Sequence, residues 1–211
     1  YWNLSLLELL QGNYKNGLEH YEFRLKKKET PFFYGKTQLK RIEHKKIKKG
    51  DKLIVISEQG LGDSLQYMRY IPYLRNQGLD VSFSADEKLH SLIKASGIDK
   101  NPLTIQQVNQ VSEGNWIPLL SLSRHLQINP KKPIITEPYI NSTVELTQKW
   151  KEIFSQEKRP IVGINWQGNP KMEQTYQGRS IPLEKFSTII EKNDIRLISF
   201  QKGFGSEQME K

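Results

Sequence analysis

The stretch K-L-I-V-I-S-E-Q-G-L-G-D, from Lys52 to Asp63, decides the fold class. Its first half, residues 52–57, is a β-branched run with turn residues on both sides, which is typical of a buried strand. Apolar residues at helical spacing follow from near Asp63 as far as Gly78, a residue suited to ending a helix. The stretch therefore predicts a strand, a glycine-containing turn and a helix, which Pro72 is expected to kink.

The same pattern then repeats along the chain. Residues 80–85 (DVSFSA) predict a second strand, and residues 87–97 predict a helix ended by Gly97. Alternating strands and helices are the pattern of a parallel α/β sheet. The signal is weaker over residues 100–142, where 101–105 and 115–120 are candidate strands and 121–128 is a candidate short helix.

A second α/β run begins after a polar break at residues 155–160, which follows an amphipathic helix at 143–155. Strands are expected at 161–166 and 196–201, with a helix at 181–192 between them. We place one domain at 52–157 and the next at 158–211. Two strands and one helix make a poor independent core, so the second domain is expected to be truncated.

Residues 1–28 predict a helical hairpin, with apolar residues at helical spacing over 2–10 and 14–25. Its pattern L-x-x-G-x-Y-x-x-G-x-x-x-Y looks like the second half of a tetratricopeptide (TPR) unit, with Gly12 and Gly17 where two helices approach closely. One hairpin cannot bury its own apolar faces. Either further repeats precede it or it packs on the next domain; an ordinary helical hairpin is the other interpretation.

The net charge of +9 is concentrated in one segment. Residues 24–52 hold three acidic residues and twelve basic ones: Arg24, Lys26, Lys27, Lys28, Lys36, Lys40, Arg41, Lys45, Lys46, Lys48, Lys49 and Lys52. We interpret 29–51 as a basic connector. The segment is a solvated linker, a docking surface for an anionic partner such as a membrane surface, or a nucleic-acid contact. No nucleic-acid-binding motif accompanies the charge, which disfavours the last.

The composition excludes several classes of protein. With 36% hydrophobic residues the chain has material for a core, and it has no run of eighteen apolar residues and no visible signal peptide. A cytoplasmic location is expected. The cysteine count of 0 excludes disulfides and thiolate sites, and none of the 4 histidines pair at ligand spacing. No metal and no cofactor are expected.

The turn at 58–63 is the first candidate site. Gly60 and Gly62 let the chain turn tightly and a ligand approach it, and a helix start suits a phosphate or polar ligand. A dinucleotide fingerprint would need a small residue at Leu65 and a distal acid, for which Asp86 is at a plausible distance. Asp63 is either the helix N-cap or a general base at the mouth of a cleft.

The loop from 167 to 180 is the second candidate site, because it again links a strand end to a helix start. Two cations beside small polar residues suit a diphosphate. An exposed polar loop without a ligand is the alternative. The candidate residues are Gln167, Gly168, Asn169, Lys171 and Arg179.

Taken together, four motifs carry a resemblance to a family: E-Q-G-L-G-D-S-L-Q-Y-x-R-Y-I-P-Y-L, G-I-N-W-Q-G-N-P, G-R-S-I-P-L and S-F-Q-K-G. They follow N-L-S-L-L-x-L-L-Q-G-x-Y-x-x-G-x-x-x-Y-E-x-R. In this order the chain resembles bacterial TPR proteins fused to a glycosyltransferase family 9-like module, similar to ADP-heptose:lipopolysaccharide heptosyltransferases. The resemblance covers nearly the whole chain and is diffuse at about 100–140.

The resemblance implies an inverting, metal-independent glycosyltransferase of GT-B fold, with a Rossmann-like acceptor domain and a Rossmann-like nucleotide-sugar domain. It implies Asp63 as the catalytic base, with Gly60, Gly62 and Gln66 in the acceptor or phosphate loop. The 167–179 residues named above would bind donor phosphates, and the acceptor would be a glycan or a protein. The helical hairpin would bind a protein partner.

Two departures from the family leave the sugar and the acceptor unnamed. The later Asp-Thr…His motif does not occur, so most of the donor domain is expected to be missing and this piece to be inactive alone. Gln66 or Tyr67 stands where heptosyltransferases have an acceptor-side histidine. The rival hypothesis is a protein-interaction scaffold with TPR-like helices and a non-catalytic transferase-like domain.

Overall fold

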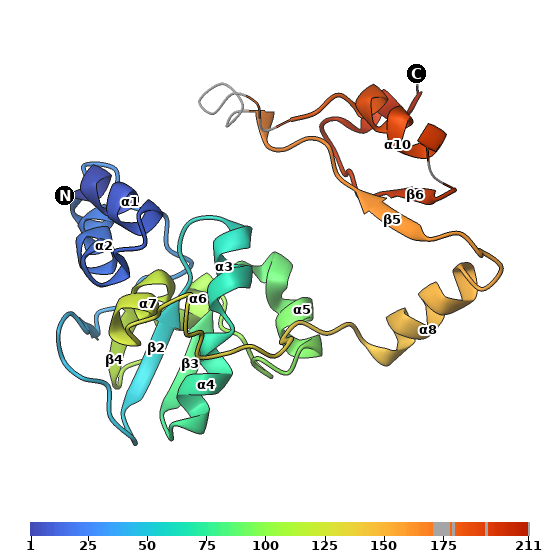
Figure 1. Ribbon diagram of the computed structural model, residues 1–211. Coiled ribbons are helices and arrows are strands. Elements are labelled where there is room, and N and C mark those ends of the chain that lie inside the picture. The colour runs from blue at the N-terminus through green and yellow to red at the C-terminus, as the bar shows by residue number, and fades with distance from the viewer. Residues whose placement is uncertain (171–177, 179, 193, 211) are drawn as a thin grey trace. The chain divides into compact units, whose positions relative to one another are not determined.

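The computed structural model describes residues 1–170, 178, 180–192 and 194–210, and Figure 1 shows their helices and strands. The chain forms two compact units, Tyr1–Thr147 and Gln148–Lys211. The predicted boundary between residues 157 and 158 lies inside the second unit. Helix α8 (Val144–Ile153) crosses from one unit to the other.

The first unit is a helical hairpin followed by strands and helices in alternation. Its helices are α1 (Trp2–Leu10), α2 (Tyr14–Tyr21), α3 (Leu61–Tyr67), α4 (Tyr70–Asn76), α5 (His90–Ala95), α6 (Ile105–Val108) and α7 (Leu122–His125). Its 3-10 turns are η1 (Glu22–Lys26), η2 (Glu87–Leu89) and η3 (Leu119–Ser121). Its strands are β1 (Lys40–Arg41), β2 (Lys52–Ile56), β3 (Asp80–Ser84) and β4 (Asn115–Pro118).

The four strands form one parallel sheet in the order β1-β4-β2-β3. Strand β2 is central and four of its five residues are buried, which is why its sequence is a continuous apolar run rather than an alternation. The predicted parallel α/β sheet is therefore confirmed, and so are the predicted strands at 52–57, 80–85 and 115–120.

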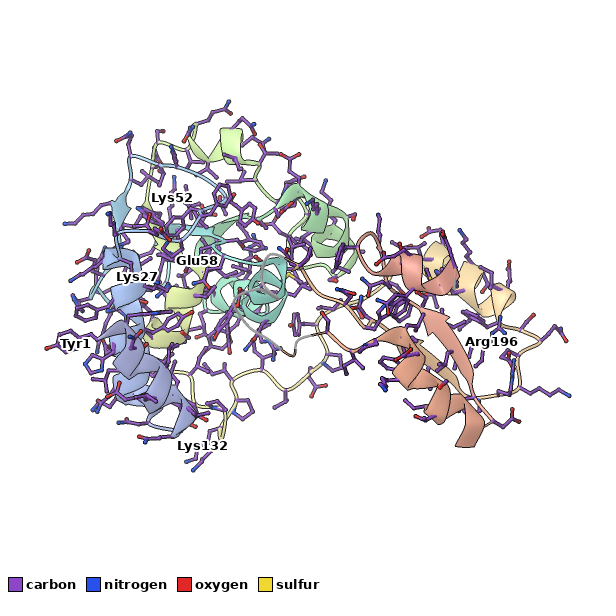
Figure 2. All side chains as sticks on the ribbon, turned by 90° about the horizontal axis from the view of Figure 1, so that it is seen from above. Tyr1, Lys27, Lys52, Glu58, Lys132 and Arg196 are labelled. Carbon is purple, nitrogen blue, oxygen red and sulfur yellow. The ribbon has the colours of Figure 1, made fainter. Side chains whose placement is uncertain are left out.

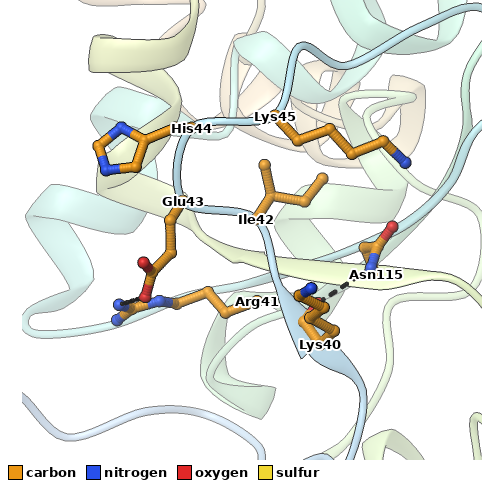
Figure 3. Close-up of a pocket in the computed structure, with 7 residues that line it drawn as sticks. All are labelled: Lys40, Arg41, Ile42, Glu43, His44, Lys45 and Asn115. Atoms are coloured by element: carbon orange, nitrogen blue, oxygen red, sulfur yellow. Dashed lines mark hydrogen bonds and ion pairs between the residues drawn. The ribbon is translucent and has the colours of Figure 1, made fainter.

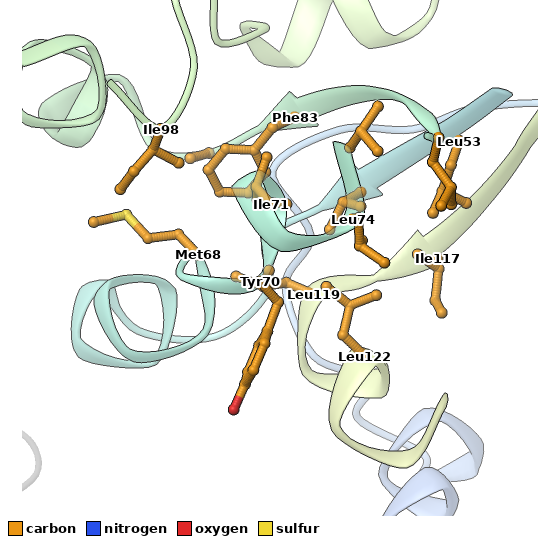
Figure 4. Packing of buried hydrophobic residues seen from close by; sticks show 14 of the residues in the cluster. Leu53, Met68, Tyr70, Ile71, Leu74, Phe83, Ile98, Ile117, Leu119 and Leu122 are labelled. Carbon is orange, nitrogen blue, oxygen red and sulfur yellow. The ribbon is translucent and has the colours of Figure 1, made fainter. Parts of the chain in front are cut away.

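Both faces of the sheet are covered. Leu53 and Val55 face a large core under α3, α4, α5 and α7, while Ile54 and Ile56 face a smaller cluster with Val108 of α6. Figure 4 shows the larger core, where the Phe83 side chain packs in among residues of α4 and the strands. Each fully buried large apolar side chain of this kind stabilises the fold by about 1.5–3 kcal/mol.

The helical hairpin packs on the α/β part of the same unit. Gly17 is buried where α2 crosses α1, and a Cβ there would lie 2.8 Å from Cγ of Leu9. Gly12, between the helices, has a left-handed φ of +80°, which glycine adopts without strain. The prediction that Gly17 allows a close approach of two helices is confirmed.

Three predictions about the first unit are wrong in detail. The candidate strand at 101–105 does not form: Leu103 makes an isolated bridge to Ser84, and α6 begins at Ile105. The predicted connector 29–51 contains β1, and Ile42 after it is 4% exposed in the main core. The predicted single helix from Asp63 is two helices that part at Met68 and Arg69, and the first begins at Leu61. Pro72 lies in the first turn of α4, where its missing N–H is tolerated.

The second unit contains a two-stranded parallel sheet. Its elements are β5 (Ile161–Ile164), η4 (Leu183–Phe186), α10 (Ser187–Lys192), β6 (Arg196–Ser199) and η5 (Ser206–Glu210). The strands and the helical segment predicted here are confirmed. Trp166, two residues after the end of β5, is 2% exposed, which agrees with its interpretation as a core residue.

Candidate functional site

The carboxyl end of β2 is the point where the strand order of the sheet reverses. Strand β3 lies on one side of β2 and β4 on the other. Ligands of open parallel sheets bind at the carboxyl ends of strands at such a point. The carboxyl end of β2 continues into residues 57–63, and the carboxyl end of β4 continues into η3. The first candidate loop therefore begins at the switch point.

The chain's own side chains fill this switch point. Glu58 is 0% exposed and Arg24, from η1 of the helical hairpin, is 1% exposed. Two nitrogens of Arg24 donate to the two carboxylate oxygens of Glu58, Nη2 to Oε1 at 2.7 Å and Nε to Oε2 at 3.2 Å. Nη2 also donates to Oγ of Ser121 at 2.9 Å. Glu58 lies in the interior of the first unit (Figure 2).

This pair corrects the sequence interpretation of Arg24, which counted it in an exposed basic segment. Burial raises the pKa of Glu58, and the guanidinium of Arg24 opposes the rise. Removing one partner of such a buried pair leaves an uncompensated charge and costs about 3–5 kcal/mol. Sequence patterns alone do not distinguish a buried arginine from a solvated one, since a single position has no periodicity.

The tight turn after β2 is made by Gln59 and not by the glycines. Gln59 has a left-handed φ of +63°, a conformation uncommon for a residue with a Cβ. Gly60 has φ −87°, and neither Gly60 nor Gly62 is among the residues with positive φ. The predicted role of these two glycines in turning the chain is therefore wrong. A Cβ on Gly62 would meet no atom within 4 Å, so the chain is open to close approach there.

Asp63 is the third residue of α3, and Gly60 is the N-cap. Its Oδ2 accepts a hydrogen bond from the backbone N–H of Gly60 at 3.1 Å. Asp63 therefore binds one backbone N–H group at the start of the helix without being the N-cap. The side chain is half-buried. In the part of the chain that is described, no hydrogen bond is made to Oδ1. Gln66, one turn further along α3, is exposed.

Residues 32–34 border the 58–63 loop, although the sequence did not predict them as site residues. The backbone of Phe33 bridges that of Glu58 in antiparallel fashion, and the carbonyl of Phe32 accepts from N–H of Gln59 at 3.1 Å. The Phe32 ring is 61% exposed and meets the Tyr34 ring edge-on at 5.1 Å between centroids. The run of three aromatic residues, Phe32 to Tyr34, inside the predicted basic connector was the sequence signal that could have found them.

Asp86 lies after β3 on the same edge of the sheet. Its Oδ1 accepts from the backbone N–H of Lys88 at 2.9 Å, as the N-cap of η2. Burial, followed by the charge of Asp86, raises the pKa of the Tyr34 hydroxyl. The structure thus brings the proposed distal acid beside residue 34 at the edge of the candidate loop.

In the second unit, two of the sequence motifs meet at the carboxyl ends of β5 and β6. Oε1 of Gln201 accepts from the backbone N–H groups of Trp166 (3.2 Å) and Gln167 (3.0 Å). The indole N–H of Trp166 donates to the carbonyl of Gly205 at 3.0 Å. Oε1 of Gln167 accepts from Nε2 of Gln208 at 3.1 Å. Gln167 is therefore held from both its backbone and its side chain.

The remaining predicted donor residues are described only in part. Gly168 and Asn169 are exposed, and a Cβ on Gly168 would meet nothing within 4 Å. Lys171 and Arg179 lie outside the described residues. The backbone just beyond β5, at residues 166–167, is therefore held by hydrogen bonds, and the backbone at residue 168 is open.

The basic segment forms open cavities away from the 58–63 loop. Figure 3 shows one of about 590 Å³, lined by Lys40, Arg41, Ile42, Glu43, His44, Lys45 and Asn115. A second, of about 730 Å³, includes Lys45, Lys46, Lys49 and His125. Neither cavity is lined by Asp63 or Gln66, so they are not part of the candidate site.

Among the described residues, no three histidine, aspartate or glutamate side chains cluster in a way that could hold a metal ion. No helix in the described ranges is long and apolar enough to cross a membrane. No protein-family model, curated protein or solved structure matches the chain. The functional argument therefore depends on the residues of this chain.

Proposed function

We propose that the chain carries acceptor-side and donor-side residues of an inverting, metal-independent glycosyltransferase, which moves a sugar from a nucleotide-sugar to an acceptor hydroxyl. The observation that carries the proposal is the geometry of Asp63. Its carboxylate stands at the ligand edge of a parallel sheet, with one oxygen held by Gly60 and the other without a partner in the described part of the chain.

That geometry suits a general base. Because Oδ2 is fixed by a backbone N–H at 3.1 Å, Oδ1 is held in a constant direction toward an approaching hydroxyl. Gly62 leaves the adjacent backbone uncovered. The exposed ring of Phe32 and the Tyr34 hydroxyl border the same loop and would contact the acceptor. Gln66 is exposed on the next turn and would lie beside it.

On the donor side, the proposal assigns the diphosphate to the loop that begins at Gln167. The N–H of Gln167 is already bound by Gln201, so Gln167 would orient the loop rather than bind phosphate directly. The open backbone at Gly168 would approach the phosphates, with Asn169 beside it and with Lys171 and Arg179 supplying positive charge.

The reaction proposed is a single displacement. The acceptor oxygen attacks the anomeric carbon and forms the new glycosidic bond while its proton passes to Asp63. The bond between the anomeric carbon and the diphosphate oxygen breaks, and its electron pair leaves with the nucleoside diphosphate. Positive charge from Arg179 would stabilise that leaving group.

A panel of nucleotide-sugars tests this function, with release of nucleoside diphosphate as the readout in the presence and absence of glycan and protein acceptors. The expected result is acceptor-dependent release with one class of donor, abolished in Asp63→Asn. Acceptor-dependent release that Asp63→Asn leaves intact would contradict the assignment of the base. Absence of release with every donor and every acceptor of the panel would contradict the function.

A protein-interaction scaffold is the second candidate, and the outer surface of α1 favours it. Leu6, Leu7 and Leu10 are 47%, 58% and 85% exposed, although apolar helix faces usually pack against a partner. In that case Leu7→Ser and Leu10→Ser would abolish partner binding while leaving the rest of the fold intact. Sugar transfer that survives both substitutions would separate the two functions.

A further inference from the structure

The guanidinium of Arg24 is fully occupied, although it is buried at the switch point of the sheet. Nε and Nη2 bind Glu58, and Nη2 also binds Ser121. Nη1 donates to Oε1 of Glu22 at 2.7 Å and to the carbonyl of Tyr21 at 3.3 Å. All five N–H bonds of the Arg24 guanidinium therefore have an acceptor. Because every donor is bound, the charged group is stable although Arg24 is only 1% exposed.

The acceptors come from both sides of a junction within the first unit. Tyr21 and Glu22 belong to the helical hairpin, whereas Glu58 follows β2 and Ser121 ends η3. Glu58 is also tied to the sheet, because its Oε1 accepts from the backbone N–H of Leu120 at 3.2 Å. The hydroxyl of Ser121 lies 2.9 Å from Oε1 of Glu22. The cluster thus joins the hairpin to the carboxyl ends of β2 and β4.

The candidate loop starts at the residue that Arg24 holds. Glu58 directly precedes Gln59, whose left-handed φ of +63° reverses the chain toward Gly60. The N–H of Gly60 then binds Asp63. A left-handed conformation at a residue with a Cβ is unfavourable and persists when its surroundings hold it. On the N-terminal side of Gln59, the backbone is fixed by the buried carboxylate of Glu58, which Arg24 binds.

We propose that Arg24 is a positioning residue for the 58–63 loop: by binding Glu58 it sets the conformation of Gln59 and the place of Asp63. The helical hairpin is then a working part of the acceptor-side site and not an appended module. The importance of this placement for sugar transfer rests on the proposed function, whereas the placement itself does not.

Amide hydrogen exchange on the whole chain tests the placement without any substrate. The reporters are the N–H groups of Gln59, Gly60 and Ser64, which bind Phe32, Asp63 and Gly60 respectively. In Arg24→Met we expect their exchange to rise at least tenfold more than that of Val55 and Phe83 in the sheet. Arg24→Lys keeps the charge but loses the two-pronged contact, and we expect an intermediate rise.

Arg75→Met is the matched control, because it removes the same group from another pair within the first unit. Arg75 binds Asp99 at 2.5 Å and the carbonyl of Val81 at 2.6 Å, both through Nη2. Its loss is expected to speed up exchange around Val81. It is not expected to raise the exchange of the loop N–H groups above that of the sheet N–H groups. The proposal would be overturned if the rise in exchange of the loop N–H groups, relative to that of the sheet N–H groups, were the same in Arg24→Met and Arg75→Met.

A second variant covers the case in which Arg24→Met does not fold. Arg24→Met/Glu58→Gln removes both charges, so that no unpaired charge remains buried. We expect this double variant to fold and still to show at least tenfold faster exchange at Gln59 and Gly60. Exchange at wild-type rates in the folded double variant would mean that the loop holds itself, and the positioning role would be wrong.

Discussion

Gln201 binds the backbone of Gln167 at both its N–H and its carbonyl. Oε1 of Gln201 accepts from N–H of Gln167 at 3.0 Å, and Nε2 of Gln201 donates to the carbonyl of Gln167 at 3.2 Å. A side-chain amide that pairs with a peptide group in this way replaces a strand neighbour just beyond the ends of β5 and β6. Two motifs separated by 34 residues therefore act as one structural feature.

Gln201→Leu is expected to destabilise the second unit by about 1–3 kcal/mol, because the partly buried N–H groups of Trp166 and Gln167 lose their acceptor. Urea unfolding followed by the indole N–H resonance of Trp166 measures this. Gln148→Leu is the matched control, since Gln148 is exposed and its side chain donates to Glu152 on its own helix. Equal losses of unfolding free energy in the two variants would argue against a stabilising role of the contacts that Gln201 makes with Trp166 and Gln167.

Asp63→Asn is expected to lower the rate of the proposed sugar transfer by about two to four decades with little change in stability. Asparagine still accepts from the N–H of Gly60 but does not take a proton from the acceptor. Steady-state turnover and thermal unfolding of the same preparation measure the two effects. Turnover within threefold of the unsubstituted enzyme would remove Asp63 from the reaction.

Changing Lys45, Lys46, Lys48 and Lys49 together to Gln is expected to leave transfer to a small soluble acceptor nearly intact. These lysines are exposed, and the cavities lined by Lys45, Lys46 and Lys49 do not include Asp63. Binding to anionic vesicles, measured by co-sedimentation at two salt concentrations, is expected to weaken. A loss of transfer as large as that of Asp63→Asn would show that the basic segment takes part in the chemistry.

Gly17→Ala and Gly62→Ala are expected to act in opposite directions although both glycines lie in helices. A Cβ at residue 17 would lie 2.8 Å from Cγ of Leu9 and 3.1 Å from its backbone nitrogen, which costs about 1–3 kcal/mol of overpacking. At residue 62 it would meet nothing within 4 Å, so the helix gains about 0.5–1 kcal/mol. Denaturant midpoints compare the two, and a stabilised Gly17→Ala would contradict the close crossing.

His125 is expected to make the stability of the first unit fall as the pH drops below about 6.5. Burial, followed by the charge of Arg124, lowers the pKa of His125 from its ordinary value. The unfolded chain then takes up a proton first, so stability is complete above the ordinary pKa and is lost as the pH falls through the lowered one. Unfolding between pH 5 and 8 measures the slope.

His125→Gln is expected to flatten that slope, whereas His44→Gln, at an exposed histidine lining the same cavity, is expected to leave it in place. The Nη2 group of Arg124 lies 3.1 Å from Nε2 of His125, a contact that a neutral ring accepts and a protonated ring repels. An unchanged slope in His125→Gln would place the titrating group elsewhere.

Local sequence alone determined most of the elements. Periodicities near 3.6 and long apolar runs predicted α1, the strands β2, β3, β5 and β6, and the parallel α/β pattern, because these depend on neighbours in the chain. The place of Gly17 at a helix crossing followed from spacing as well. Asp63 stood out for the same reason, since a glycine turn and a helix start are local features.

Tertiary structure alone decided the roles of Arg24, Glu58 and Gln59. Arg24 was counted with the lysines because its sequence neighbours are basic; its partner Glu58 lies 34 residues away and neutralises it in the core. Strand β1 has two residues, too few to show any alternation, and it exists because β4 offers an edge to pair with. The left-handed turn at Gln59 likewise requires the buried contacts around it, and burial is a property of the folded chain as a whole.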